Sequence, residues 1–188
     1  MTAPIYIALI HYPVRNKEGK IVTTSVTNFD LHDLARTART YGIPRHFIVT
    51  PNPSQQDMAR YIKNYWIEGK GAAHNPDRRL AFEGQEITAT IEECRLTIQK
   101  LHGNSPRLVA TTAQLTNKST DFKDLKGWIQ KTDKPFLILF GTGWGLEEAV
   151  LNGADFVLAP ICGPSDYNHL PVRAAVAIVL DRLLGQPS

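Results

Sequence analysis

The sequence lacks long apolar runs: no stretch of its 188 residues approaches the roughly eighteen consecutive apolar residues of a membrane span. Its first residues show neither a basic segment ahead of an apolar one nor a small-residue cleavage site, so we expect no signal peptide. Only two cysteines are present, Cys94 and Cys162, and their spacing fits neither a zinc site nor a redox motif. These absences favour a cytoplasmic protein with reduced thiols and no contact with a membrane.

Motifs that mark several common enzyme classes are also missing. The glycine-rich segment 141–145 lacks the third glycine of a dinucleotide-binding fingerprint, because Leu146 stands there, and no lysine follows as in a phosphate-binding loop. The six histidines show no metal-ligand spacing, and no Ser/His/Asp arrangement stands out. We therefore expect no metal site, and an unrelated α/β nucleotide-binding enzyme, such as a small kinase or reductase, is disfavoured.

Charge and apolar content indicate a folded domain rather than an obvious nucleic-acid binder. Hydrophobic residues make up 43% of the chain and the net charge is only +3. Residues 1–45 and 107–134 each carry six basic and three acidic side chains, whereas residues 135–188 carry two basic and five acidic ones. This distribution is either ordinary scatter of surface charge or a surface that is more basic on one side.

Apolar runs that predict strands alternate with amphipathic stretches that predict helices. Strands are expected at 4–11, 46–50, 87–89, 107–112, 135–140 and 156–159. Helices are expected at about 28–41 (capped by Asn28 or Asp30), 54–68 (capped by Ser54), 91–101, 121–131, 146–151 and 171–184, with loops at 14–27 and 69–84. This order predicts one α/β domain over residues 1–188, with a mostly parallel sheet and helices on both faces.

Ligands of such sheets bind beyond the carboxyl ends of the strands, which points to the loops at 112–116, 141–146 and 160–170. In the second of these loops a buried strand runs directly into Gly141, Gly143 and Gly145. Glycines there either let the backbone approach a ligand or only provide a tight turn with positive φ.

Two further segments are candidates for function. The helix at 171–184 is apolar on nearly all sides, which is typical of a core helix or of a helix at a subunit interface. In the segment 26–43, Arg36 and Arg39 lie beside His32, a cluster suited to binding a phosphate or a base unless it is simply a solvated helix face.

Taken in their order along the chain, these three segments resemble the three motifs of the SPOUT methyltransferases, the α/β-knot RNA methyltransferases related to SpoU and TrmD. The first motif lies in 28–42, the second is Leu139-Phe140-Gly141-Thr142, and the third lies in 158–176. The sequence is most similar to a bacterial single-domain group typed on Aquifex and Thermotoga proteins and described as S-adenosylmethionine (SAM)-dependent RNA methyltransferases. Residues 11–14, 27–42 and 167–176 carry that similarity.

The resemblance implies a deep trefoil knot at the C-terminal end and a homodimer to which the apolar terminal helix contributes. It also implies SAM as the cofactor and an RNA substrate, tRNA or rRNA. The adenine of SAM would meet backbone groups of the late loops, since an uncharged edge needs neutral donors and acceptors. The cofactor-binding residues that it implies are Thr112, Phe140, Gly141, Thr142, Gly143, Gly145, Pro160, Ile161, Asn168 and Leu170.

The same resemblance suggests roles in catalysis and RNA binding. Arg36 matches the arginine that the SpoU branch places near the reacting nucleotide, and Asn28 matches the polar residue of that motif. Both are expected to orient the substrate or to assist its deprotonation. The residues expected to bind the RNA are Arg15, Lys17, Lys20, His32 and Arg39.

Two departures from the SpoU pattern keep the target atom open. Gly143 stands where the second SpoU motif usually carries a glutamate, and Asn168-His169-Leu170 replaces the Ser-Leu-Asn of the third. Methylation of a base and methylation of a ribose 2′-hydroxyl therefore both remain open. The alternative function is a non-catalytic RNA-binding or assembly protein on the same scaffold.

Overall fold

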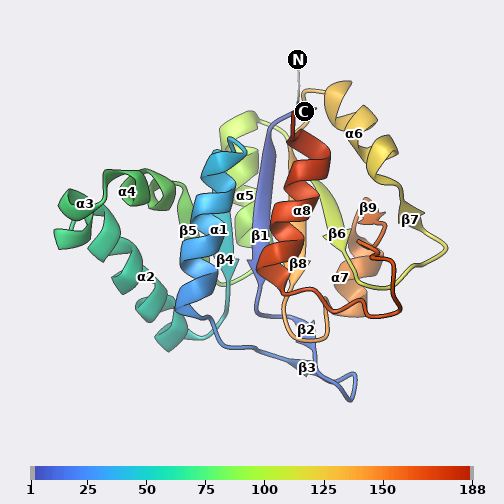
Figure 1. Ribbon diagram of the computed structural model, residues 1–188, viewed down its shortest axis with the longest axis horizontal. Coiled ribbons are helices and arrows are strands. Elements are labelled where there is room, and N and C mark those ends of the chain that lie inside the picture. Colours follow the sequence, from blue (N-terminus) through green and yellow to red (C-terminus); the bar gives the residue numbers. More distant parts are fainter. Residues whose placement is uncertain (1–2, 187–188) are drawn as a thin grey trace.

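A seven-stranded sheet forms the centre of the computed structural model, which describes residues 3–186 (Figure 1). Its strands are β1 (Ile5–Ile10), β4 (His46–Val49), β5 (Gln85–Thr88), β6 (Arg107–Thr111), β7 (Ser119–Thr120), β8 (Phe136–Gly141) and β9 (Phe156–Leu158). They lie in the order β5-β4-β1-β8-β6-β9-β7, and all six pairings are parallel. The predicted α/β fold with a mostly parallel sheet is therefore confirmed.

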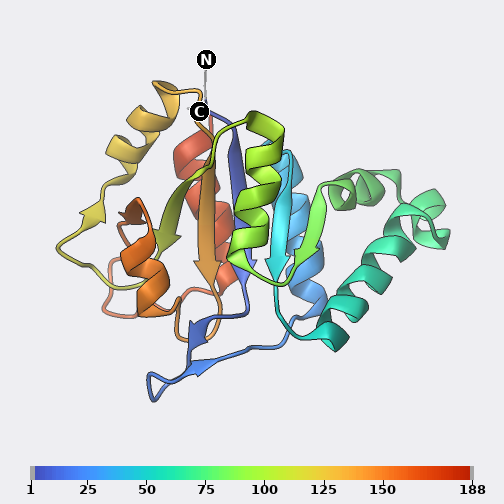
Figure 2. The same cartoon turned by 180° about the vertical axis from the view of Figure 1, so that it is seen from behind.

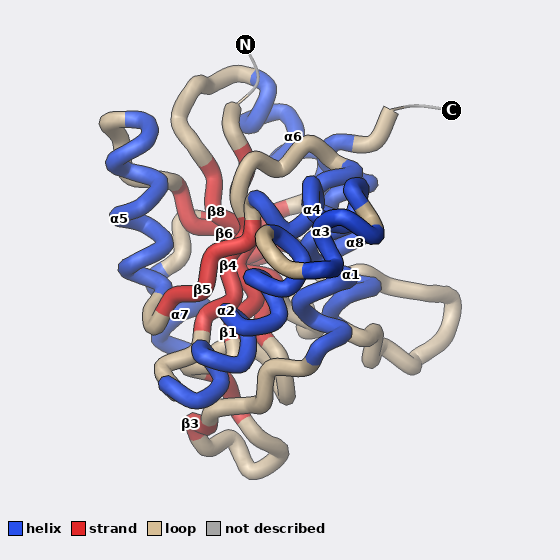
Figure 3. Tube along the Cα trace, turned by 90° about the vertical axis from the view of Figure 1, so that its left-hand side faces the viewer, coloured by secondary structure: helices blue, strands red, loops and turns tan. Residues whose placement is uncertain are grey.

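Helices cover both faces of this sheet. One face carries α1 (Asn28–Thr40), α6 (Phe122–Gln130) and α8 (Val172–Leu184), together with an arm of α2 (Pro53–Ile67), α3 (Lys70–His74) and α4 (Pro76–Glu83) (Figures 1 and 3). The other face carries α5 (Ile91–His102) and α7 (Glu148–Gly153), which lie in front of the sheet in Figure 2. None of the helices in residues 3–186 is both long and apolar enough to cross a bilayer.

Burial on both faces explains why the central strands are continuous apolar runs. In β1, Ile5, Ile7 and Leu9 pack against the side of α1 and α8, while Ala8 and Ile10 face the side of α5. A strand with helices on both sides leaves few positions for polar groups, such as the Tyr6 hydroxyl that bonds with His102, so the alternation typical of half-exposed strands is lost. The apolar pattern that predicted the strand is thus a consequence of the two covering layers.

The ends of the helices differ slightly from expectation. Thr27, and neither Asn28 nor Asp30, is the N-cap of α1: its hydroxyl accepts from the N–H of Asp30, whose carboxylate accepts from the Thr27 N–H in return. This reciprocal pair satisfies two backbone donors, which a cap one residue later could not do. Likewise Asn52 caps α2 in place of Ser54.

The segment 69–84 was expected to be a loop, and this prediction is wrong. It contains α3 and α4, and Asn75 caps α4 ahead of Pro76 at its first position. Phe82 of α4 is fully buried and stacks at 6.3 Å on Trp66 of α2. Packing of these rings outweighs the glycines and the proline that suggested a loop.

Three smaller predictions also need correction. The expected loop at 14–27 includes a two-stranded antiparallel hairpin, β2 (Val14–Arg15) with β3 (Ile21–Val22). The edge strand β5 begins two residues earlier than expected, at Gln85, and the short helix α7 runs over Glu148–Gly153 rather than 146–151. Residues 1–2 and 187–188 of the expected domain 1–188 lie outside the described residues.

Candidate active site

Three loops come together at the carboxyl edge of the sheet, because β8, β6 and β9 are neighbours and point the same way. They are the loops after β6, after β8 and after β9 that the sequence indicated (Figure 1). The loops after β6 and β9 are linked directly, since Asn168 Nδ2 donates to the carbonyl of Ala113 at 2.8 Å. Segments that are 55 residues apart in the chain therefore form one surface.

The glycines after β8 are required by the local geometry. A Cβ on Gly141 would lie 2.6 Å from the backbone nitrogen of Leu146, and Gly143 and Gly145 have φ of +59° and +97°. The chain thus turns back tightly on itself, and the N–H of Gly145 closes the turn on the carbonyl of Thr142 at 3.0 Å. The turn interpretation of this motif is confirmed, and the turn lies at the edge where ligands of such sheets bind.

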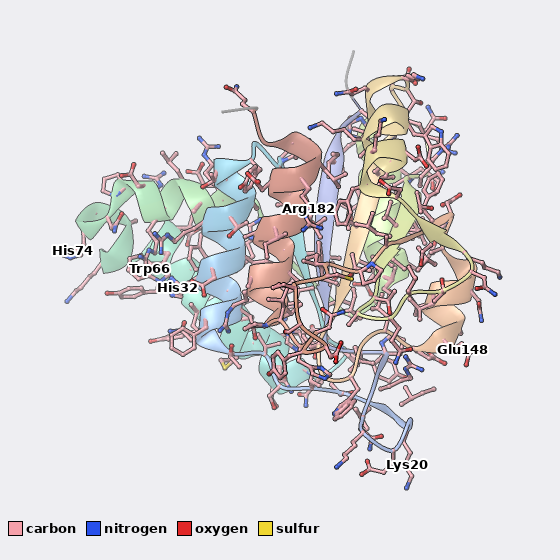
Figure 4. The ribbon with its side chains drawn as sticks, turned by 45° about the vertical axis from the view of Figure 1, so that its right-hand side comes forward. Lys20, His32, Trp66, His74, Glu148 and Arg182 are labelled. Atoms are coloured by element: carbon pink, nitrogen blue, oxygen red, sulfur yellow. The ribbon has the colours of Figure 1, made fainter. Side chains whose placement is uncertain are left out.

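The β2–β3 hairpin packs against this glycine turn, a contact that the sequence did not suggest. Arg15 donates its N–H to the carbonyl of Gly145 at 2.9 Å, and Trp144 donates its N–H to the carbonyl of Arg15 at 3.0 Å. A side chain on Gly143 would approach Arg15 O to 3.1 Å. The hairpin and the turn are therefore one unit, from which Lys20 projects at the far tip (Figure 4).

A partly buried chain of hydrogen bonds fastens the hairpin to the sheet. Thr142 Oγ1 donates its only proton to the carbonyl of Ile10 at 2.9 Å. It therefore accepts from the hydroxyl of Thr24. Thr24 in turn accepts from His11 Nδ1 at 3.0 Å, which places the imidazole proton on Nδ1. The sequence places His11 at the end of the expected strand 4–11 and does not indicate these hydrogen bonds, because the three side chains are too far apart in the chain to show a spacing.

His11 itself is neutral at physiological pH. It is 1% exposed, and burial lowers its pKa to about 4, against the opposing effect of the Asp30 charge. Its Nε2 is buried and has no hydrogen-bond partner among the described residues. The imidazole therefore acts as a neutral donor that holds Thr24 in place.

The N-termini of α1 and α8 meet at the same edge through Arg173. Its guanidinium lies 3.3 Å from Asp30 Oδ1 and 3.2 Å from Asp33 Oδ2, and it covers the ring of Phe29 at 5.4 Å. Beside it runs a groove of about 390 Å³, lined by Asp33, Arg36, Thr37, Pro171, Arg173 and Ala174. The arginine of the first motif is thus exposed at the border between two helices.

The structure separates the other residues expected at the catalytic and RNA-binding sites. Asn28 and Arg36 are eight residues apart on α1, about 12 Å along its axis. His32 points into the arm, where its ring packs edge-to-face on Phe82 at 4.9 Å and its Nδ1 bonds with Arg78 at 3.0 Å (Figure 4). Arg39 lines a different cavity, together with Arg45 and Lys63, near the amino ends of β4 and β5.

The expected cofactor-binding residues lie on the three loops with their side chains in different settings. Phe140 is buried in the core, so only its backbone could meet a ligand. Within the described chain, the backbone groups of residues 160–170, which include Pro160, Ile161 and Leu170, make no hydrogen bond with other backbone groups. The Pro160 carbonyl accepts from Cys162 Sγ at 3.8 Å. Backbone N–H and C=O groups without a backbone partner, beside half-buried Thr112 and Ile161, fit the uncharged edge of an adenine.

The described residues hold no group of three or more His, Cys, Asp or Glu side chains placed to bind a metal ion. The polar contacts at this edge come from hydroxyls, backbone groups, the neutral His11 imidazole, the Asn168 amide and the Arg173 ion pairs with Asp30 and Asp33. Such a site can hold a neutral ring system and an anionic substrate in contact, which is what a group-transfer reaction needs.

Comparison with known proteins agrees with this chemistry. A family model described as "SAM-dependent RNA methyltransferase" matches residues 4–185. An uncharacterised protein of Aquifex aeolicus is 42% identical over 182 residues, covering 97% of this chain and 89% of that protein. A tRNA (guanine-N(1)-)-methyltransferase of Oleidesulfovibrio alaskensis is 40% identical over 181 residues, 96% of this chain but only 42% of that enzyme.

The fold is shared with a solved structure at low sequence identity. The A. aeolicus TrmH/SpoU tRNA modifying enzyme matches with a TM-score of 0.56 at 16% identity, covering 96% of this chain and 74% of that one. The family model confirms the predicted SAM-dependent RNA methyltransferase family and SAM as its cofactor. The shared fold agrees with the predicted resemblance to SPOUT methyltransferases.

Proposed function

The chain belongs to the family of SAM-dependent RNA methyltransferases, and we propose that it methylates tRNA as a homodimer. The observation that carries the proposal is the meeting of three loops at the carboxyl edge of β8, β6 and β9, next to the helix that bears Arg36. The choice of tRNA rests on the names of relatives that this chain matches over less than half of their length. A base and a ribose 2′-hydroxyl are both chemically suitable acceptors.

We propose that the three loops hold SAM through their backbone. The groups of 160–170 that lack a backbone partner would bind the adenine, and the turn of Gly141, Gly143 and Gly145 would leave room beside it. Thr112, Thr142 and Asn168 border the same space, and Asn168 keeps two of the loops together. Bound SAM supplies an activated methyl group, so the protein needs only to position the acceptor and remove its proton.

Arg36 is proposed to act on the acceptor nucleotide. Its guanidinium is exposed in the groove between α1 and α8, where it stabilises the negative charge that develops on the attacking atom as the proton leaves. Arg15, Lys17 and Lys20 on the hairpin are proposed to bind phosphates of the RNA. Asn28, two helical turns from Arg36, would contact a neighbouring nucleotide.

The homodimer is proposed on the outer surface of α1 and α8. Ala174, Ala177 and Ile178 of α8 stay partly exposed although the helix is apolar on nearly all sides. Burying them against a second copy would bring a second set of groove residues near the first. Light scattering should then give twice the mass of one chain.

A trefoil knot is proposed for the C-terminal third. Two hydrogen bonds support this proposal: Asn168 Nδ2 donates to the carbonyl of Ala113, and the Ala159 N–H donates to Thr120 O at 2.8 Å. They hold the loop after β9 across the loop after β6. From there the chain continues into α8, which lies over the middle of the sheet. A crystal structure traced through 112–171 tests the threading.

The decisive experiment combines tritiated SAM with RNA from a strain that lacks the gene, followed by mapping of the labelled nucleoside. Calorimetry should show micromolar binding of SAM or S-adenosylhomocysteine, about −8 kcal/mol. Gly143→Val should abolish binding, since φ there is +59° and its Cβ would meet Arg15 O at 3.1 Å. Absence of cofactor binding by the wild-type protein would reject the proposal, and binding without methyl transfer to any RNA would favour the non-catalytic alternative.

A further inference from the structure

Two exposed aromatic rings lie on the proposed cofactor loops without any packing role that explains them. Trp144, in the glycine turn, is 58% exposed, and Tyr167, in the loop after β9, is 76% exposed. His169 connects them: its ring centroid lies 6.4 Å from that of Trp144 and 5.4 Å from that of Tyr167, both edge-to-face. In this arrangement the imidazole supports the two larger rings, and much of their surface stays open to solvent.

The position of Trp144 is fixed by its backbone. Its N–H donates to Arg15 O at 3.0 Å, and the glycines on either side have positive φ, so the side chain projects from a closed turn. The ring is thus held at the surface by the turn and not by burial. A large apolar group kept exposed at a fixed place is typical of a binding surface.

The surroundings of the two rings indicate the chemistry of the partner. The hairpin that docks on the same turn carries Arg15, Lys17 and Lys20 against a single acidic residue, Glu18. Cations that bind phosphates next to exposed aromatic faces are the combination that proteins use to bind single-stranded nucleic acid. A duplex does not offer an unpaired base face, so the ligand is a looped-out or unpaired nucleotide.

From this geometry we infer that Trp144 and Tyr167 stack on an unpaired nucleobase of the RNA substrate and thereby present its nucleotide to the cofactor loops. The inference rests on the proposed function for the identity of the substrate. Stacking reads the flat face of a base and not its edge, so these rings position the nucleotide while other groups select it.

The test compares binding and methylation of unfractionated tRNA by Trp144→Ala and Tyr167→Ala, in buffer containing S-adenosylhomocysteine for the binding arm. Each variant should weaken tRNA binding and raise KM about five- to hundred-fold, with little change in kcat and an unchanged affinity for S-adenosylhomocysteine. Trp144→Phe and Tyr167→Phe should restore most of the loss, because phenylalanine keeps a stacking face. Tyr61→Ala is the matched control, since Tyr61 is also 76% exposed but lies on α2, in the arm (Figure 1).

Tryptophan fluorescence gives a readout that does not depend on activity. Addition of tRNA should quench the emission of the wild-type protein and much less that of Trp144→Phe, in which Trp66 and Trp128 remain.

Loss of cofactor affinity in the alanine variants with intact tRNA binding would overturn the inference, because the rings would then stack on the cofactor. Unchanged tRNA binding and quenching in all variants would overturn it as well. Failure of the proposed function is distinguishable, because the wild-type protein itself would then fail to bind cofactor or transfer a methyl group.

Discussion

Gly141→Ala tests whether the turn after β8 is as tight as the structure indicates. The added methyl group would lie 2.6 Å from the Leu146 nitrogen and 2.9 Å from the Gly145 carbonyl carbon. An ordinary contact begins at 3.4 Å, so the nearer overlap is about 0.8 Å, and it is with backbone rather than with a side chain that could rotate away. The strand end and the turn must therefore move apart.

The cost follows from what the turn holds in place. Overpacking of this kind costs roughly 1–3 kcal/mol of folding free energy. Leu146 is buried, and its neighbour Gly145 accepts the hydrogen bond of the hairpin, so a shift here also displaces the hairpin. We expect destabilisation of about 2 kcal/mol and, since a displaced loop no longer fits the ligand, a loss of at least about ten-fold in S-adenosylhomocysteine affinity.

Urea unfolding and titration calorimetry measure the two effects separately. Gly153→Ala is the control, because nothing lies within 4 Å of its added Cβ, its φ is not positive, and α7 ends there. It should leave cofactor affinity unchanged and stability equal or slightly higher. If Gly141→Ala bound cofactor as tightly as the wild-type protein and unfolded at the same urea concentration, the described turn and its role in the site would both be wrong.

Three further outcomes are expected. Burial lowers the pKa of His11 to about 4 and of His46 to about 3. Both histidines stay neutral in the folded protein and bind protons once it unfolds, so their contribution to stability is complete above pH 6.5 and is lost as the pH falls, by roughly 3 kcal/mol for each histidine at pH 4. Urea unfolding measured as a function of pH checks this, and a stability that does not change with pH would contradict their burial. Arg173→Met should lower the free energy of unfolding by about 1–3 kcal/mol, because Asp30 is 5% exposed and would lose its charged partner. Asp30→Asn also alters the cap at Thr27, so the two changes are combined in a double-mutant cycle, in which a coupling energy near zero would show that the pair is not responsible. Arg36→Lys should lower kcat about ten- to thousand-fold with unchanged cofactor affinity and urea midpoint, and unchanged kcat would remove it from the reaction.

The central fold could be predicted because its strands are buried on both faces. β1 and β8 are uninterrupted apolar runs, and the helices between strands carry clear caps such as Thr90 and Gly103 of α5. Helices α3 and α4 of the arm were missed because Gly69, Gly71 and Pro76 interrupt the segment, although Asn75 followed by Pro76 is a recognisable helix start. What folds the arm is the contact of Trp66 with Phe82, which no local pattern contains.

The site was predictable in its location but not in its assembly. Because parallel strands end at one edge, the loops after β6, β8 and β9 had to meet there whatever their sequences. The docking of the hairpin on the glycine turn and the hydrogen bonds from His11 through Thr24 to Thr142 join residues up to about 130 positions apart. Single polar residues in loops show no periodicity, so their pairing is visible only once the fold is known.

Helix α8 contributes both to the stability of the fold and to the geometry of the site. Val176, Val179, Leu180 and Leu183 lie in the core between α1 and α6, and each contributes roughly 1.5–3 kcal/mol by burial. Their sum is comparable to the whole stability of an ordinary domain. At its first turn the same helix carries Arg173, which holds the start of α1 beside the groove of Arg36. Changes in α8 therefore disturb folding and function together, whereas the exposed rings of Trp144 and Tyr167 lie outside the core and can be altered one at a time, which makes them the better probes of the reaction.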